Sequence, residues 1–203
     1  LRQGVRSEYQ RFVNLIERSG RRLLLMLDSM LDLAQLGAGT LEIDERSYNV
    51  LEVVESTVES VRPLAEEKGL DVVVKMPRGR CYARFDHGIL TRIINNLLDN
   101  AIKFTDEGEV GVEVRGREER VEILVHDTGI GIDEKFVPYV FDPFVQESTG
   151  LDRSHQGSGL GLSVSKRLLE RMGGDIRFSS EKGKGTVFTV LLPSANGARL
   201  APS

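Results

Sequence analysis

The chain has 203 residues, which is enough for one domain with a well-formed core and one additional element. Its formal net charge of −4 and sequence pI of about 5.5 argue against a nucleic-acid-binding surface, which is normally basic, and against a polybasic membrane face. We therefore expect no nucleic-acid partner and no membrane contact.

Cys81 is the single cysteine, so an intramolecular disulfide is excluded and a reducing compartment is expected. The apolar runs are too short to span a bilayer, and the most apolar one, residues 23–27, ends at Asp28. Because the sequence opens at Leu1 without an initiator methionine, we expect a piece of a longer protein whose upstream part could include membrane spans. This piece itself is expected to be cytoplasmic.

Residues 4–36 are predicted to form one long helix. Apolar side chains recur in it at steps of three and four residues, which is the pattern of an apolar stripe along one helix face. We expect this stripe to pack either on another helix of the same chain or in a dimerising helical hairpin, and the periodicity favours neither. Gly37 and Gly39 are expected to end the helix, and we place the domain boundary after residue 38.

From residue 39 to residue 193 helical and strand patterns alternate, which predicts an α+β domain. Helices are expected at residues 50–68, 86–104 and 158–172, and Asp86 is the expected N-cap of the second. Residues 128–157 are predicted to be a loop, and residues 194–203 a disordered tail. Strands are expected at residues 41–44, 70–75, 81–85, 109–115, 121–127, 175–180 and 186–192.

Three polar side chains share one face of the predicted helix 86–104. Asn96, Asn100 and Lys103 stand at i, i+4 and i+7, while Ile93 and Leu97 belong to the buried side. Amide oxygens can coordinate a hard cation and lysine neutralises phosphate charge, so this face suits a magnesium–phosphate site. The alternative is an ordinary solvated face, which is the commoner explanation for such a segment taken alone.

The predicted strand 121–127 places a carboxylate among apolar side chains. Its period of two puts Asp127 on the same face as Val121, Ile123 and Val125. A buried carboxylate needs a donor, and an adenine amino group would be one. The glycines at 129 and 131 would let the backbone approach the base. The alternative is a strand that ends in an aspartate–glycine turn.

Small residues gather where the helix 158–172 is expected to begin, in the segment GSGLGLSVSK at residues 157–166. Free backbone N–H groups at a helix N-terminus bind phosphate, and glycine lets the phosphate come close. The segment matches neither the P-loop pattern nor the dinucleotide-binding fingerprint, so alone it is a weak signal.

Together, and in this order, the motifs resemble those of the sensor histidine kinases of two-component systems, which bind ATP on a Bergerat-type (GHKL) fold. The resemblance covers residues from about 41 to 193, and residues 4–38 resemble the second helix of the family's dimerisation hairpin. It implies a two-layer α/β sandwich, with a mixed sheet and helices on one face, preceded by a long N-terminal helix. The matching segments are the N box NLLDNAIKFT at 96–105, the first glycine box DTGIGI at 127–132, the phenylalanine box FDPF at 141–144, the second glycine box GSGLGL at 157–162, and GTVF at 185–188.

The resemblance implies roles position by position. Asn100 would coordinate Mg²⁺, and Asn96 and Lys103 would face the phosphates of ATP as the catalytic pair. Asp127 would bind the adenine amino group, and Thr186 would assist through water. The remaining positions implied to contact the nucleotide are Phe104, Gly129, Gly131, Ile132, Arg153, Gly157, Ser158, Gly159, Leu160, Gly161 and Leu162, of which Arg153 lies in a lid at residues 145–157.

The family's acceptor histidine lies in a motif like His-Glu-x-x-x-Pro on the first hairpin helix. The histidines of this chain are His87, His126 and His155, and none of them stands in such a motif or on the N-terminal helix. We therefore expect the first hairpin helix to lie upstream or to have been removed. His155 falls in the implied lid and has the best claim of the three to a nucleotide contact.

Related ATPases of this fold, such as gyrase and the heat-shock chaperones, usually carry a glutamate one turn before the magnesium-binding asparagine. Here that position is Asn96, whose amide cannot act as a general base at neutral pH. The site is therefore expected to hold ATP without rapid hydrolysis and to pass its γ-phosphoryl group to a histidine. The resemblance implies three partners: a response-regulator receiver domain, the chain's own dimerisation hairpin, and a second copy in a homodimer.

Two alternatives share the fold. A regulatory pseudokinase would bind ATP yet form no phosphohistidine, and the complete set of boxes argues against it. A serine kinase of the anti-sigma type is disfavoured by the long amphipathic helix that leads into the domain. The glycine boxes exclude a purely structural helical protein.

Overall fold

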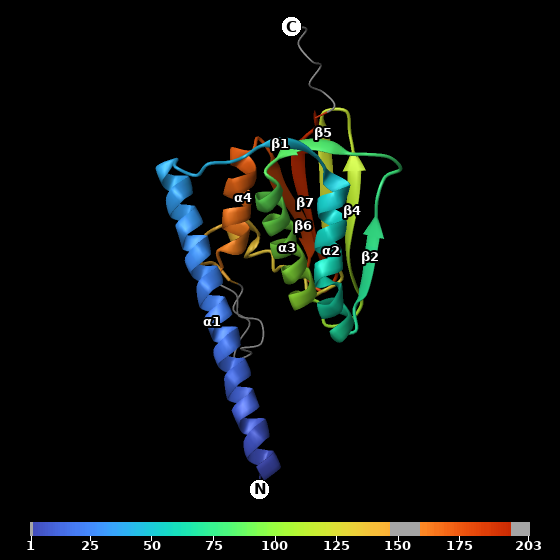
Figure 1. The fold of residues 1–203 in the computed structure, drawn as a ribbon. Helices are drawn as coiled ribbons and strands as arrows, with labels where there is room; N and C mark the ends of the chain where they lie inside the picture. The colour runs from blue at the N-terminus through green and yellow to red at the C-terminus, as the bar shows by residue number, and fades with distance from the viewer. Residues whose placement is uncertain (1, 147–158, 196–203) are drawn as a thin grey trace. The chain divides into compact units, whose positions relative to one another are not determined.

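The computed structural model describes residues 2–146 and 159–195, and it divides at Leu41 into two units, Leu1–Leu41 and Glu42–Ser203. The first unit consists of helix α1 (Arg2–Ala38), which confirms the expected long helix (Figure 1). Several large apolar side chains of α1 are exposed to solvent: Phe12, Val13, Ile16, Leu23, Leu24, Leu27, Met30 and Leu31. No helix within the described residues combines the length and the apolar character needed to cross a membrane.

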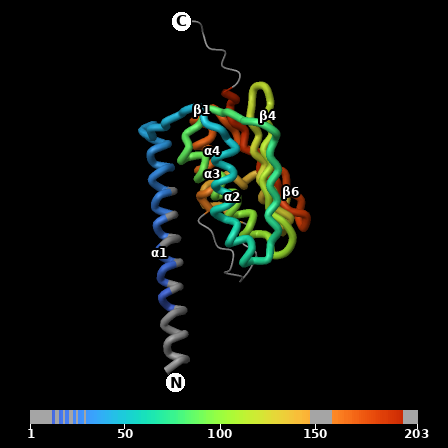
Figure 2. The backbone as a smooth tube through the Cα atoms, turned by 45° about the vertical axis from the view of Figure 1, so that its right-hand side comes forward, coloured from blue at the N-terminus to red at the C-terminus, as the bar shows by residue number. Residues whose placement is uncertain are grey.

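The second unit is a two-layer α/β sandwich, as expected. One layer is a five-stranded sheet in the order β2-β4-β5-β7-β6, in which β2 and β4 run parallel and every other pair is antiparallel. Helices α2, α3 and α4 lie together on one face of this sheet, as Figures 1 and 2 show from two directions. The strands are β2 (Asp71–Lys75), β4 (Glu109–Gly116), β5 (Arg120–Asp127), β6 (Asp175–Glu181) and β7 (Gly185–Pro193).

The helices of this unit are α2 (Val50–Glu67), α3 (His87–Phe104) and α4 (Gly161–Arg171). Helix α3 is central, because its apolar face packs against β4 and β5 while its flanks contact α2 and α4. Asp86 caps its N-terminus as expected, since the Oδ1 atom accepts a hydrogen bond from the Ile89 N–H at 3.1 Å. The buried side of α3 consists of Leu90, Ile93, Ile94, Leu97, Leu98, Ala101 and Ile102.

The strand predicted at residues 41–44 is wrong. These residues alternate between half-buried and exposed positions, as a strand does, but they pair with no neighbour. The strand lies farther along the chain, at β1 (Arg46–Asn49), which pairs antiparallel with β3 (Tyr82–Phe85). The Tyr48 ring packs on the Phe85 ring at 5.5 Å between centroids, and this aromatic contact helps to fix the register.

Helix α4 begins later than predicted, at Gly161 rather than at residue 158. Gly159 has φ +70°, a left-handed conformation that interrupts a right-handed helix. Within the predicted loop 128–157 the structure adds a short 3₁₀ helix, η1 (Val137–Tyr139). The predicted disordered tail lies mostly outside the described residues.

Candidate nucleotide-binding site

The three polar residues of α3 all lie half-buried on one side of the helix, and Asn96 joins α3 to α4. Its Nδ2 atom donates a hydrogen bond to Ser165 Oγ at 3.2 Å. Its Oδ1 atom lies against Gly161, the first residue of α4, so closely that any side chain at position 161 would overlap it. The N box and the second glycine box are therefore in direct contact.

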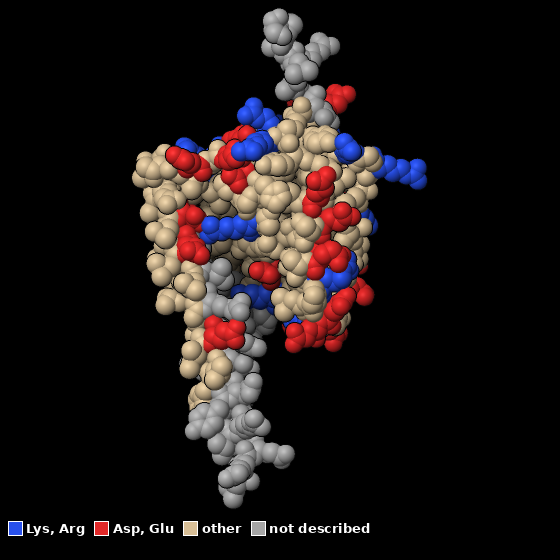
Figure 3. Space-filling model, in the orientation of Figure 1, with Lys and Arg blue, Asp and Glu red and all other residues tan. Residues whose placement is uncertain are grey.

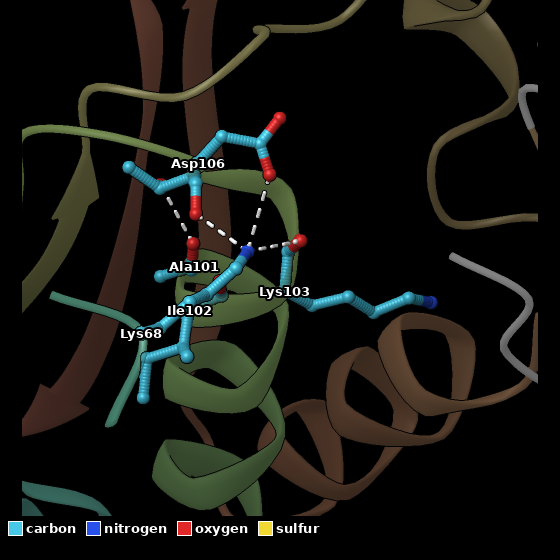
Figure 4. Close-up of polar contacts among 6 residues, drawn as sticks. Lys68, Ala101, Ile102, Lys103 and Asp106 are labelled. Carbon is cyan, nitrogen blue, oxygen red and sulfur yellow. Dashed lines mark hydrogen bonds and ion pairs between the residues drawn. The ribbon is translucent and has the colours of Figure 1, made fainter. Parts of the chain in front are cut away.

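Lys103 and Phe104 lie in the last turn of α3. The Lys103 ammonium group lies 4.6 Å from the centroid of the Phe104 ring. Figure 4 shows the Lys103 side chain running away from the cluster of main-chain carbonyls at the end of the helix. The cation and the two amides at positions 96 and 100 thus belong to the same half-buried helix, with the cation at its C-terminal end.

Asp127 is the last residue of β5 and pairs with Thr186 of β7. Its side chain is half-buried, and its Oδ1 atom accepts a hydrogen bond from the Gly129 N–H at 2.9 Å. Burial raises the pKa of the Asp127 carboxyl, although main-chain hydrogen bonds from Gly129 and Thr186 and the nearby His126 act in the opposite direction. A carboxylate held in this way suits a ligand that donates hydrogen bonds.

Thr186 belongs to a small polar cluster that the sequence did not reveal. Its Oγ1 atom lies 2.9 Å from Ser180 Oγ on the neighbouring strand β6. Ser180 also donates to the Gly185 carbonyl at 3.0 Å and accepts from the Ile132 N–H at 2.8 Å. Because the Ser180 hydroxyl has one proton, Thr186 is the donor between the two hydroxyls. The period of two in β6 could have identified Ser180, since it shares a face with Ile176 and Phe178.

The glycines of the first glycine box are required by main-chain packing. A side chain at position 129 would overlap the Phe104 carbonyl, and one at position 131 would overlap the Glu181 carbonyl. Gly131 also has φ +62°, which favours glycine. Ile130 between them donates its N–H to the Phe104 carbonyl at 3.1 Å. The box is thus held between the end of α3 and the β6–β7 turn.

The second glycine box is tied to the phenylalanine box. The Phe144 N–H donates to the Gly159 carbonyl at 2.9 Å, and Phe144 itself has φ +67°, which is rare for a non-glycine residue. Leu160 is fully buried and Leu162 half-buried. Arg153, Gly157 and Ser158, and with them most of the expected lid at 145–157, lie outside the described residues.

Comparison with known proteins decides the family. A family model described as histidine kinase-, DNA gyrase B- and HSP90-like ATPase matches residues 85–196, more than half of the chain. This chain belongs to that ATPase family. The matched region contains α3, the Asp127 strand, the described part of both glycine boxes and Thr186.

Proteins similar to this chain include sensor kinases. The sensor histidine kinase RcsC of Escherichia coli is 38% identical over 90% of this chain, and LuxQ of Vibrio cholerae, an autoinducer 2 sensor kinase/phosphatase, is 36% identical over 95%. The match takes up 19% of RcsC and 23% of LuxQ, so the chain spans about a fifth of the length of these curated relatives.

Solved structures agree with the ATPase family assignment. The crystal structure of full-length ShkA in complex with AMPPNP has a TM-score of 0.79 and 30% identity, over 92% of this chain and 39% of that chain. The histidine kinase AdeS of Acinetobacter baumannii has a TM-score of 0.73 at 19% identity, over 91% of this chain and 84% of that one, and supports the fold alone. The second unit therefore has the fold of this ATPase family and resembles in sequence the corresponding part of sensor histidine kinases.

The histidines that the structure describes in this unit are His87 and His126. His87 is exposed at the start of α3, with its ring edge-on to Tyr48 at 5.6 Å between centroids. His126 is half-buried on β5, with Nδ1 3.9 Å from a Glu109 carboxylate oxygen. His155 lies outside the described residues.

On the face shown in Figure 3, lysine and arginine side chains are scattered among acidic ones.

Proposed function

We propose that ATP binds with its adenine at Asp127 and its phosphates between the polar face of α3 and the start of α4. The observation that carries this proposal is the contact of Asn96 with Gly161, because it brings the amide face of α3 to a helix N-terminus. The N-terminus of an α-helix offers free N–H groups and a partial positive charge to an anion. Asn96 and Lys103 would then face the phosphates from the other side.

The base would occupy the far end of the same site. Asp127 would accept a hydrogen bond from the adenine amino group, and Thr186 would support this contact through a water molecule. The half-buried state of the Asp127 carboxylate and the hydroxyl cluster at Thr186 support these roles. The residues proposed to line the site between base and phosphates are Phe104, Gly129, Gly131, Ile132, Gly159, Leu160 and Leu162, joined by Arg153, Gly157 and Ser158 of the segment that is not described.

Mg²⁺ fits this site through Asn100. The Asn100 amide is half-buried on the same helix as Asn96 and Lys103 and offers a neutral oxygen ligand, of the kind Mg²⁺ accepts alongside phosphate oxygens and water. When bound, the ion would offset phosphate charge. Lys103 contributes positive charge to the same end of α3, and Asn96 positions the phosphates against α4.

We further propose that the parent protein is a protein-histidine kinase. The side chain one turn before Asn100 is the amide of Asn96, which does not remove a proton from water at neutral pH. The domain would therefore retain ATP until a histidine enters and accepts the γ-phosphoryl group in line. The phosphoryl group would pass onward to an aspartate of a response-regulator receiver domain.

Residues 1–38 are proposed to supply the second helix of the dimerisation hairpin, with residues 39–193 as the catalytic domain. The exposed apolar side chains along α1 support this role, because an unpaired apolar stripe on a long helix favours helix–helix association. The proposed assembly is a homodimer in the parent protein.

The first experiment is calorimetric titration of the chain with ADP and with a non-hydrolysable ATP analogue, in Mg²⁺ and then in chelator. The variant Asn100→Ala should lose the tightening by Mg²⁺. Its matched control is Asn95→Ala, because Asn95 is also a half-buried asparagine of α3 but lies off the polar face. Absence of binding to the native chain would contradict the proposal.

A second assay tests the reaction class. With ATP and a supplied histidine-bearing hairpin, the chain should form an acid-labile, base-stable phosphohistidine on the hairpin. Nucleotide binding without transfer would favour a regulatory pseudokinase, and an acid-stable phosphoserine would favour the serine-kinase alternative.

A further inference from the structure

The C-terminus of α3 has a complete set of hydrogen-bond donors. The last four carbonyls of an α-helix have no partner within the helix, and they form the negative end of its dipole. Here the Ala101 carbonyl accepts from Thr105 Oγ1 at 2.7 Å, and the Phe104 carbonyl accepts from the Ile130 N–H at 3.1 Å. The two carbonyls between them, those of Ile102 and Lys103, are bound by a side chain from another helix.

That side chain is Lys68, at the C-cap of α2 (Figure 4). Its ammonium nitrogen lies 2.9 Å from the Ile102 carbonyl oxygen, 3.1 Å from that of Lys103 and 2.6 Å from that of Thr105. An ammonium group has three N–H donors, so these three carbonyls can use all of them. The Asp106 carboxylate lies farther away, at 3.4 Å.

The main chain around Lys68 is held in place by hydrogen bonds. Its own main-chain N–H bonds back to α2, and Gly69 follows with φ +76°, which ends the helix. Leu70, buried at 4% exposure, donates its N–H to the Ala65 carbonyl at 2.9 Å. The side chain of Lys68 therefore extends to α3 from a well-defined helix end.

The peptide groups bound by Lys68 belong to the proposed nucleotide site. One is the carbonyl of Lys103, whose side chain would face the phosphates. The next residue is Phe104, whose carbonyl binds Ile130 and packs against Gly129 in the first glycine box. The Lys68 ammonium group thus binds the C-terminal end of α3. This helix end positions both Lys103, on the phosphate side of the proposed site, and the first glycine box, on the base side.

We propose that Lys68 is a positioning residue of the nucleotide site, which acts through the main chain at the end of α3 and touches no nucleotide itself. The inference rests on the proposed function. The Lys68 side chain is 33% exposed, so water can reach the carbonyls when the ammonium group is removed. Substitution is therefore expected to loosen the helix end while the domain remains folded.

The test compares Lys68→Met, which keeps the length and the apolar stem, with the native chain in ADP titrations well below the unfolding temperature. We expect the Kd to rise roughly 3- to 30-fold, the range of coupling that residues outside a ligand site exert. Lys75→Met is the matched lysine control, because Lys75 is an exposed residue of β2, and it should leave the Kd unchanged.

Two further variants separate positioning from stability and from charge. Val54→Ala removes fully buried volume from α2, so it should lower the unfolding temperature without changing the Kd. Asp106→Asn removes the ion pair but leaves the carbonyl contacts, and it should also preserve the Kd. Lys68→Met with a native Kd, or a loss reproduced by either variant, would overturn the inference. If the native chain binds no ADP, the proposed function fails instead.

Discussion

The amide of Asn96 occupies the space where a side chain at position 161 would lie. Asn96 lies in the middle of α3, and Gly161 is the first residue of α4. The two helices therefore meet here through the Asn96 side chain and the main chain of Gly161. The hydrogen bond from Asn96 to Ser165, one turn farther along α4, holds the amide there. A residue with a side chain at position 161 would therefore have to displace the Asn96 amide.

This relationship predicts that Gly161→Ala will displace Asn96. The overlapping atoms are the end of a flexible side chain, so the cost to folding should be small, within about 1 kcal/mol, because alanine also favours the helix. Nucleotide affinity should fall, since the amide would rotate away from α4. Calorimetry and thermal unfolding together measure the two effects.

Gly88→Ala is the control for that variant. Gly88 lies in the first turn of α3, where an added Cβ would lie 3.5 Å from Asp86 Oδ1, an ordinary contact. It should leave both stability and affinity near native. Equal affinity in Gly161→Ala and the native chain would contradict the proposed role of Asn96.

Asp127→Asn is predicted to stabilise the nucleotide-free domain at pH 7. Burial raises the pKa of the Asp127 carboxyl in the folded state. The contribution of this carboxyl to folding stability is therefore fully present below the ordinary aspartate pKa, and it is lost as the pH rises through the raised pKa. The asparagine amide does not ionise, so its contribution does not fall as the pH rises. The free energy of unfolding of the variant should therefore exceed that of the native chain by about 0.5–2 kcal/mol at pH 7, the range of single stabilising substitutions. The gain should vanish near the ordinary aspartate pKa, about 3.9.

Urea unfolding at the two pH values measures this difference, with Asp71→Asn, at an exposed position of β2, as the control. Saturating ADP should reverse the order, because ligand binding stabilises the native chain and the variant lacks the proposed adenine acceptor. A variant less stable than the native chain at pH 7 would mean that Asp127 serves the fold rather than a ligand.

Local signals in the sequence were sufficient for most elements. Asp86 before an apolar periodic segment predicts the cap of α3, and the helix predicted at residues 50–68 agrees with α2 to within one residue. The contacts of Lys68 were not predictable, because its partners lie 34 to 37 residues away and lysine near a helix end is usually solvated. Strand β1 was missed for a similar reason, since its pairing depends on β3 and on the Tyr48–Phe85 contact.

Gly131→Ala is predicted to destabilise the domain more than Gly69→Ala. Both glycines have positive φ, of +62° and +76°, so both variants carry the backbone cost of about 1–2 kcal/mol. Position 69 is open, whereas a Cβ at 131 would overlap the Glu181 carbonyl. The overlap with main chain should add about 1–3 kcal/mol. Urea unfolding measures the difference. Equal losses of stability in the two variants would show that the β6–β7 turn moves to accommodate the added methyl group at little cost.

The two ends of α3 should respond differently to loss of their caps. Asp86 caps the N-terminus through Ile89, and its other oxygen accepts from the Asp44 N–H at 3.0 Å. Asp86→Ala should therefore lower stability by about 1–2 kcal/mol, as the loss of a helix N-cap does, whereas Asp86→Asn should lower it less. Asp44→Ala keeps the main-chain N–H and should have little effect.

Nucleotide affinity should survive Asp86→Ala, because this cap lies ten residues before Asn96, at the opposite end of α3 from the carbonyls that Lys68 binds. Thermal unfolding and ADP titration of Asp86→Ala and Lys68→Met thus form a pair. Asp86→Ala should lower stability and leave nucleotide affinity unchanged. Lys68→Met should lower nucleotide affinity and reduce stability only modestly. If both variants weaken binding in proportion to their loss of stability, then α3 responds as one rigid unit, and its C-terminus has no separate influence on the site.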